Sequence, residues 1–264
     1  MNEISGGVTE ADEALKLRDI SDSDVARLAQ EIERAGVAVI PSYIDDTTLA
    51  RLRQVVVGIV DGNGGEYTVL TGKVELANTL RDRIGVAPEL LSLMHRIYEN
   101  GCGRAAPVQS LYQVLRCLSG TSGLRQAYFF HYDSYVVTAL LPIIMPQEGV
   151  TGDLVMKPNH RRVRGSYLAN LIDKMLVDNQ LAQKYFRRQA DSHQGSFTKV
   201  QIVPGNLYLF WGYRSLHANE PCDPRMIRAT ALFHFGDPHA DSRLRKLTGR
   251  AKVRATAAPA AAPA

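Results

Sequence analysis

The chain has 264 residues, of which 45% are hydrophobic and 22% are charged, a composition typical of one soluble globular domain and unlike that of a disordered or membrane-spanning chain. Its formal net charge of +4 is concentrated from Asp241 onward and the preceding residues are close to neutral, so the charge does not indicate a nucleic-acid-binding surface. The three cysteines form no CxxC pair, which argues against a disulfide framework and against a zinc-finger site.

The N-terminal part of the chain is predicted to be mostly helical. Residues 1–20 are acidic and polar and lack the basic and apolar regions of a signal peptide, so we expect a mobile segment and a cytoplasmic protein. With Ser21 or Asp22 as the N-terminal cap, apolar residues at helical spacing predict a helix that ends at Gly36. A strand over 37–44 and a second helix over 46–60 are expected to follow.

A glycine-rich stretch then separates the second helix from the next one. Residues 61–73, DGNGGEYTVLTGK, have no periodicity and are interpreted as a loop that could act as an active-site flap. A further helix is predicted over 88–100.

From Val108 the sequence changes to short apolar runs separated by turn residues, which predicts a β-sandwich or barrel. A segment at about 161–195 reads as helix and loop inserted between strands and could form a lid. The basic, Ala/Pro-rich tail at 241–264 is predicted to be disordered. The predicted strands cover residues 108–118, 126–134, 135–144, 152–158, 197–204, 205–213 and 226–235.

One predicted strand carries two polar residues in an aromatic context, AYFFHYDSYVV. Because side chains alternate along a strand, His131 and Asp133 are expected to point to the same face and Tyr132 to the other. A buried carboxylate needs an opposite charge, a metal or solvent. His217 follows a later strand and precedes Arg228 by eleven residues. Two histidines and one carboxylate form the facial triad of non-haem iron(II) oxygenases. The other histidines, among them His234, are not predicted to be ligands.

Several motifs resemble those of one family. HYD, followed far downstream by HANEPCDPRMIRAT, resembles the H-x-D…H…R-x-S/T pattern of iron(II)/2-oxoglutarate-dependent oxygenases. The segments GDLVMKPNHRR and PGNLYLF resemble those of the phytanoyl-CoA dioxygenase-like branch. The resemblance covers roughly residues 24–236. It implies a mainly β domain with flanking helices over 21–240, folded as a double-stranded β-helix, the cupin-like jelly roll.

The resemblance also implies the composition of the site. His131, Asp133 and His217 would bind Fe(II), and Arg228 with Thr230 would bind the cosubstrate 2-oxoglutarate. Further contacts to cosubstrate or substrate are expected from an earlier strand, with Gln109, Tyr112 and Arg116 as open alternatives. The implied reaction consumes O2 and 2-oxoglutarate, yields succinate and CO2, and hydroxylates, desaturates or cyclises an unactivated C–H position. The presence of Asp133 favours hydroxylation over halogenation.

The sequence indicates the substrate less specifically than it indicates the metal ligands. A small metabolite, such as an amino acid or a natural-product intermediate, is expected, with no nucleic-acid or membrane partner and with a homodimer as one possible assembly. The basic NHRRVR segment suggests an anionic or carrier-linked substrate as the alternative. The alternative function is a cupin-fold metal-binding isomerase or sensor, which would not need Arg228. Candidate substrate-binding residues are Arg116, Tyr135, Arg161, Trp211 and Arg214.

Overall fold

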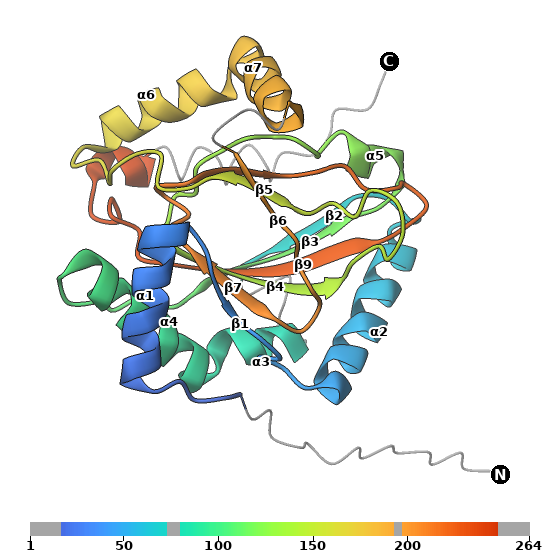
Figure 1. Ribbon diagram of the computed structural model, residues 1–264, viewed down its shortest axis with the longest axis horizontal. Helices are drawn as coiled ribbons and strands as arrows, with labels where there is room; N and C mark the ends of the chain where they lie inside the picture. Colours follow the sequence, from blue (N-terminus) through green and yellow to red (C-terminus); the bar gives the residue numbers. More distant parts are fainter. Residues whose placement is uncertain (1–16, 73–79, 193–196, 248–264) are drawn as a thin grey trace.

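The computed structural model describes residues 17–72, 80–192 and 197–247, which fold into two antiparallel sheets with helices around them (Figure 1). The strands of the larger sheet lie in the order β1-β7-β4-β9-β3-β2, and the smaller sheet has the order β6-β5-β8. In chain order the strands are β1 (Ala38–Ile40), β2 (Thr68–Thr71), β3 (Tyr112–Leu118), β4 (Val137–Ile144), β5 (Leu154–Lys157), β6 (Thr198–Val200), β7 (Leu207–Phe210), β8 (Leu216–Asn219) and β9 (Arg228–Phe235).

The predicted N-terminal helices are present and pack against the larger sheet. Ser21 accepts a hydrogen bond from the backbone N–H of Asp24 at the start of the first helix, and Gly36 ends it in the left-handed conformation. The helices are α1 (Asp22–Ala35), α2 (Asp46–Gly62), α3 (Leu80–Val86), α4 (Pro88–Cys102), α5 (Gly120–Leu124), α6 (Tyr167–Asp178) and α7 (Gln180–Asp191). In the described part of the chain no helix combines the length and apolar character needed to cross a membrane.

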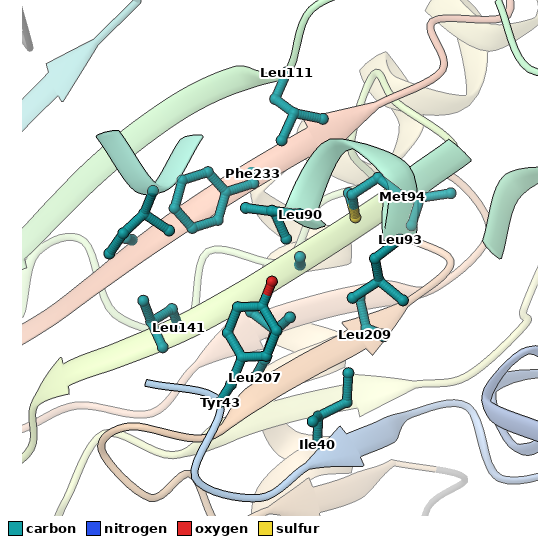
Figure 2. Close-up of a cluster of buried hydrophobic side chains, with 14 of the residues drawn as sticks. Ile40, Tyr43, Leu90, Leu93, Met94, Leu111, Leu141, Leu207, Leu209 and Phe233 are labelled. Carbon is teal, nitrogen blue, oxygen red and sulfur yellow. The ribbon is translucent and has the colours of Figure 1, made fainter. Parts of the chain in front are cut away.

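The main hydrophobic core lies between α4 and the larger sheet (Figure 2). Leu90, Leu93 and Met94 project from α4 onto strand residues that include Leu209 and Phe233. On β9 every second residue, from Ala229 to Phe235, belongs to this core. The alternate residues of β9 therefore face the smaller sheet.

A second core fills the space between the sheets. Leu140 and Phe210 of the larger sheet pack with Leu154 and Met156 of the smaller one, all of them buried. The inward face of β9 carries Arg228, Thr230, Leu232 and His234. The polar residues Arg228, Thr230 and His234 therefore point into the space between the two sheets, where the candidate site lies.

The helical insertion is present and lies on the outer face of the smaller sheet. Val177 of α6 and Phe186 of α7 pack in a third apolar cluster with Val155 of β5 and Leu216 of β8. Tyr132 joins the same cluster. These helices thus pack on the smaller sheet from outside, and Figure 1 shows them at one edge of the molecule.

Some predicted elements differ from the structure. Residues 126–134 do not form a regular strand, because only His131 makes a β-bridge there. The stretch 61–73 is not entirely a loop, since β2 pairs with β3 through Thr68–Thr71. Leu17 and Ile20 are buried, so packing begins inside the segment expected to be mobile. Predictions for residues 1–16, 193–196 and 248–264 fall outside the described residues.

Candidate metal centre

Two distant histidines are brought together by backbone pairing. The N–H of His131 donates to the carbonyl of His217 over 3.0 Å, and the N–H of His217 donates back to His131 over 3.1 Å. His217 lies on β8, whose ladder with β5 fixes its direction toward the inter-sheet space. His131 thereby extends the smaller sheet by one residue. The two imidazole rings lie with their centroids 4.5 Å apart.

Both imidazoles are oriented by hydrogen bonds at Nδ1. His131 Nδ1 lies 2.9 Å from the carbonyl oxygen of Phe129, and His217 Nδ1 lies 3.0 Å from that of Ser215. A backbone carbonyl can only accept, so each Nδ1 carries a proton, and Nε2 is the atom of each ring that a metal could bind. Both Nε2 atoms lie 3.7 Å from the same carboxylate oxygen, Oδ1 of Asp133. This separation exceeds a hydrogen bond.

Asp133 is buried and is held by its other oxygen. Thr138 donates to Oδ2 over 2.5 Å, and His234 Nδ1 lies 3.6 Å from that oxygen and 3.0 Å from the hydroxyl of Thr138. The backbone N–H of Asp133 donates to the carbonyl of Gly212. A Cβ at Gly212 would collide with both Asp133 and Thr138. Oδ2 is thereby engaged, and Oδ1 faces the two histidines.

The ionisation of the cluster matches a set of metal ligands. Burial raises the pKa of Asp133, but His217, His234 and His131, together with the Thr138 hydrogen bond, outweigh it and hold this pKa below its usual range. Burial and the neighbouring His217 lower the pKa of His131 below that of free imidazole. At neutral pH the cluster therefore presents one carboxylate and a neutral His131.

His131, Asp133 and His217 together could hold a cation. One ligand atom from each lies within 4.8 Å of the others. Neutral imidazole nitrogens with a carboxylate oxygen suit a divalent transition metal, and two histidines with one carboxylate are the ligand set of non-haem iron(II) sites. The hydrogen bonds at Nδ1 and Oδ2 are the outer contacts that metal ligands ordinarily make. These donors thus fit an iron(II) ion.

A basic pocket adjoins the cluster. Arg228 is buried, and its Nε donates to the carbonyl of Gly152 over 2.5 Å. Burial and the neighbouring Arg116 lower the pKa of Arg228 to about 10, so the guanidinium is charged at neutral pH. Arg116 lies across the β3–β9 ladder, opposite Thr230. Its Nε is buried and meets no hydrogen-bond partner in the described part of the chain. Two guanidinium groups and an unsatisfied donor fit a carboxylate ligand.

The pocket between the cluster and Arg228 is narrow. His131, His217, Arg116, Arg228 and Thr230 line it. Its volume of about 40 Å³ lies far below the roughly 300–1,000 Å³ of typical ligand pockets. A dicarboxylate would fit only after side chains that line the pocket rearrange.

Two residues predicted to contact the cosubstrate do not line the pocket, although the ring centroid of Tyr112 lies 6.1 Å from that of His234. Gln109 accepts a hydrogen bond from the backbone N–H of Asp237, outside the pocket. Tyr112 lies four residues before Arg116 on β3 and stacks on Tyr135, with ring centroids 5.4 Å apart. Of the alternatives on this strand, Arg116 is the one that lines the pocket.

The predicted substrate-binding residues separate into two groups. Tyr135 is half-buried and stacks on His234 with ring centroids 5.6 Å apart, so it lies beside Asp133. Trp211 is buried, and its Nε1 donates to Glu33. Arg214 forms two hydrogen bonds with the same carboxylate. Trp211 and Arg214 therefore lie on the helix-facing side of the larger sheet, away from the pocket.

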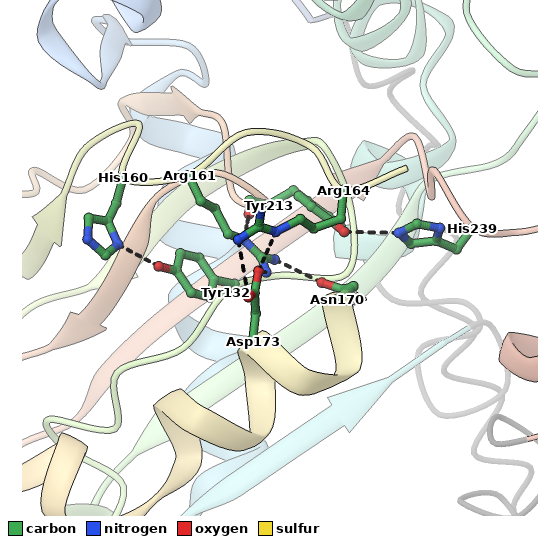
Figure 3. A network of polar contacts seen from close by, with 8 residues as sticks. All are labelled: Tyr132, His160, Arg161, Arg164, Asn170, Asp173, Tyr213 and His239. Atoms are coloured by element: carbon green, nitrogen blue, oxygen red, sulfur yellow. Dashed lines mark hydrogen bonds and ion pairs between the residues drawn. The ribbon is translucent and has the colours of Figure 1, made fainter. Parts of the chain in front are cut away.

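Arg161, also predicted to bind substrate, is instead a buried internal contact (Figure 3). Its guanidinium carbon lies 3.9 Å from the ring centroid of Tyr132 and 4.4 Å from that of Tyr213. It donates to the carbonyl of Tyr213 and to two side chains of α6, Asn170 and Asp173. The sequence cannot reveal this role, because the anion that neutralises Arg161 comes from an inserted helix. Arg161 connects α6 to the residues flanking the metal cluster.

Three contacts of the cluster were missed by sequence reasoning. His234 and Thr138 are polar residues inside apolar strands, and that contrast was a usable signal, because a buried polar group needs a partner. Gly212 had no local signal, since its role depends on the close approach of Asp133.

Comparisons with known proteins identify the fold. No family model matches the chain, and no curated protein matches it. A prolyl hydroxylase from Trichoplax adhaerens, solved in complex with a hypoxia inducible factor oxygen degradation domain peptide fragment, is 13% identical with a TM-score of 0.56, over 84% of this chain and 93% of that one. HygX from Streptomyces hygroscopicus, with nickel and 2-oxoglutarate bound, is 13% identical with a TM-score of 0.54, over 80% and 86%.

A prolyl-4-hydroxylase from Pseudomonas putida is similar to the same degree. It is 13% identical with a TM-score of 0.52, over 80% of this chain and 98% of that one. These likenesses confirm the predicted fold: the two antiparallel sheets with flanking helices form a double-stranded β-helix.

Proposed function

We propose that this protein is an iron(II)/2-oxoglutarate-dependent oxygenase that acts on a small metabolite. The observation that carries the proposal is the convergence of His131, Asp133 and His217, with ligand atoms within 4.8 Å of one another, beside a pocket that contains the buried Arg228. A metal ligand set and a carboxylate-binding arginine in one inter-sheet space are what such a reaction needs.

Each group has a distinct task in this proposal. His131, Asp133 and His217 would hold the iron and leave coordination positions open. Arg228, with the hydroxyl of Thr230, would bind the distal carboxylate of 2-oxoglutarate, since a guanidinium pairs with a carboxylate in a fixed orientation. When bound, iron(II), 2-oxoglutarate and O2 supply the oxidising chemistry, with succinate and CO2 as products.

The chain's remaining contribution is to orient groups and exclude water. Thr138 holds Oδ2 of Asp133, so that Oδ1 faces the histidines. Leu140, Leu154 and Phe210 form an apolar wall beside the pocket. Such a wall strengthens the attraction between Arg228 and an anionic cosubstrate, because it lowers the local dielectric constant.

The finer assignments form part of the same proposal. The motifs at 152–162 and 204–210 favour the phytanoyl-CoA dioxygenase-like branch. Because Asp133 occupies the carboxylate position, hydroxylation is the proposed outcome, with desaturation or cyclisation as variants. The neighbours named above bind 2-oxoglutarate or peptides according to their descriptions, and a small molecule is our choice for this chain. A cupin-fold isomerase or sensor is less favoured, since it has no use for Arg228 in the pocket.

The proposal can be tested by spectroscopy and product analysis. Anaerobic addition of iron(II) and 2-oxoglutarate should give a weak visible charge-transfer band, which should be absent in His131→Ala. Arg228→Ala should retain iron and weaken 2-oxoglutarate binding by about 10- to 100-fold, because a charge-assisted bidentate contact is lost.

Arg225→Ala provides the matched control. Arg225 is an exposed arginine three positions earlier, and its partner is Asp223, so its removal should leave the band unchanged. A metal-loaded protein that neither binds 2-oxoglutarate nor converts it to succinate would refute the proposal.

A further inference from the structure

A second and larger cavity opens on the helix-facing side of the larger sheet, at the C-terminal end of α4. Its volume is about 510 Å³, within the range of small-molecule pockets. We call it the arginine cleft. The residues that line it are Gly101, Cys102, Arg104, Val136, Arg162, Val163, Arg164, Gly165, Trp211, Arg214 and Pro238.

The charge of the arginine cleft is strongly unbalanced. Arg104, Arg162, Arg164 and Arg214 line it, and none of the described residues that do so is acidic. Two carboxylates lie next to these arginines: Glu33 pairs with Arg214, and Asp173 pairs with Arg164. Asp173 is already shared with the buried Arg161 (Figure 3). Five guanidinium groups therefore face two carboxylates.

Two of the guanidinium groups have no carboxylate partner within the described residues. Arg162 is exposed and makes no ion pair within the described residues. Arg104 is exposed and lies over the ring of Tyr98, with 5.5 Å between its guanidinium carbon and the ring centroid. They line the cleft from different segments, Arg104 from the residues just after α4 and Arg162 from the loop after β5. An anion placed between them would receive hydrogen bonds from both sides.

One feature of the cleft opposes an anion. The C-terminus of α4 points at it, and Gly103 caps that helix in the left-handed conformation. A helix C-terminus carries about half a negative charge, which is smaller than the excess of guanidinium groups. The net field therefore still favours an anion.

The remaining walls are apolar and firmly supported. Val136, Val163 and Pro238 line the cleft together with Trp211. A Cβ at Gly101 would collide with the indole ring of Trp211, so the end of α4 lies directly against that ring. Cationic and apolar walls in one cavity suit a ligand that combines an anionic group with a carbon skeleton.

We propose that the arginine cleft binds a phosphate-bearing small molecule, with the phosphate between Arg104 and Arg162 and the organic part against Val136 and Val163. A phosphate offers several oxygens to the two guanidinium groups. The cleft shares no lining residue with the pocket beside the metal cluster. The inference therefore does not rest on the proposed oxygenase activity.

The test uses phenyl phosphate as the probe and phenol as the neutral control, in calorimetric titrations of the intact protein. Phenyl phosphate should bind saturably and more weakly as salt is added, and phenol should not bind. The double variant Arg104→Ala/Arg162→Ala should weaken binding by more than about tenfold, because two charge-assisted contacts are lost. Arg225 is an exposed arginine outside the cleft, so the Arg225→Ala variant should bind phenyl phosphate with the same affinity as the original protein.

Cys102 supplies a second readout inside the cleft. It is half-buried, whereas Cys117 and Cys222 are buried, so Cys102 should react first with iodoacetamide. Phenyl phosphate should slow its alkylation in the original protein and not in the double variant. Equal affinity of the two proteins for phenyl phosphate, or no saturable binding to either, would overturn the proposal.

Two further measurements separate this site from the metal pocket. The double variant should bind 2-oxoglutarate with Mn(II) as the original protein does, and loss of that binding would contradict a separate site. Pairs of phosphorylated and dephosphorylated metabolites can then be compared. If only the phosphorylated member of a pair leads to succinate formation, the cleft holds part of the substrate. If the phosphorylated member binds without succinate formation, the cleft binds a separate ligand. Both results support a phosphate site.

Discussion

The candidate metal centre joins two regions that are built in different ways. His217, Arg228 and Thr230 lie on β8 and β9, where backbone ladders set the direction of each side chain. We call them the strand half. His131 and Asp133, the loop half, lie on a segment in which His131 makes the single β-bridge. Backbone hydrogen bonds to His217 and Gly212, together with side-chain contacts to distant residues, hold the loop half in place.

This difference shows where the site is vulnerable. A ladder tolerates the loss of one side chain, because its backbone hydrogen bonds remain. The loop half depends on Arg161, which stacks on Tyr132, and on Gly212 and Thr138, which contact Asp133. Changes to these residues should disturb the metal cluster, although none of them is a proposed ligand.

The largest effect is expected from Arg161→Met. Methionine keeps much of the apolar stem but removes the donors to Tyr213, Asn170 and Asp173. Asp173 keeps its ion pair with Arg164, but the carbonyl of Tyr213 and Oδ1 of Asn170 each lose a buried donor, which together costs about 2–6 kcal/mol. The free energy of unfolding, measured by chemical denaturation, should fall by this amount, and titration with Mn(II) should show weaker metal binding.

Arg164→Met is the matched control, because Arg164 donates to the same carboxylate but is 44% exposed. An exposed ion pair contributes about 1 kcal/mol or less, so this variant should remain close to the original protein. An equal decrease in the free energy of unfolding for Arg161→Met and Arg164→Met would contradict the idea that the buried contacts of Arg161 stabilise the loop half.

The same contrast explains what the sequence could predict. The direction of Thr230 and Arg228 follows from alternation along an apolar strand, a local property. His131 and Asp133 were placed on one face by the same reasoning, and they do share a face, while Tyr132 packs on the other side. The assumption of a regular strand over 126–134 is wrong. The positions of His131 and Asp133 depend instead on backbone hydrogen bonds to β8 and to Gly212.

Arg161 and Gly212 show the limit of local patterns. A basic residue in NHRRVR predicts an external anion as readily as an internal one, and the choice depends on where α6 packs. The need for a glycine at 212 arises from a contact with a residue far away in the sequence. Both depend on tertiary structure, so neither could be predicted from the chain alone.

A smaller effect is expected from Gly212→Ala, which tests the loop half without removing any hydrogen bond. The new methyl group would collide with Asp133 and Thr138. The backbone hydrogen bond from Asp133 to Gly212 keeps the two segments from moving apart to relieve the collision. Overpacking costs about 1–3 kcal/mol, and displacement of Asp133 should weaken Mn(II) binding up to about 100-fold.

Gly58→Ala is the control for added volume. Gly58 lies on α2 with open space around the position of a Cβ, and alanine there should stabilise the helix by about 0.5–1 kcal/mol. Unchanged Mn(II) affinity in Gly212→Ala would show that Asp133 does not depend on this close approach.

The smallest effect is expected from Thr138→Val, which keeps the shape of the side chain and removes its hydroxyl. Oδ2 of Asp133 then loses its donor, and the carboxylate can rotate so that Oδ1 no longer faces both histidines. Loss of such an outer contact should weaken Mn(II) binding about tenfold, with about 1 kcal/mol lost from the free energy of unfolding. Thr138→Ser retains the hydroxyl and should restore most of the affinity. Because Thr138 lies on β4 of the larger sheet, its ladder remains intact in both variants. A tenfold loss in Thr138→Val that Thr138→Ser reverses would therefore assign the effect to the hydroxyl of Thr138, which contacts both Asp133 and His234. Equal losses in the two variants would assign the effect to packing within the strand.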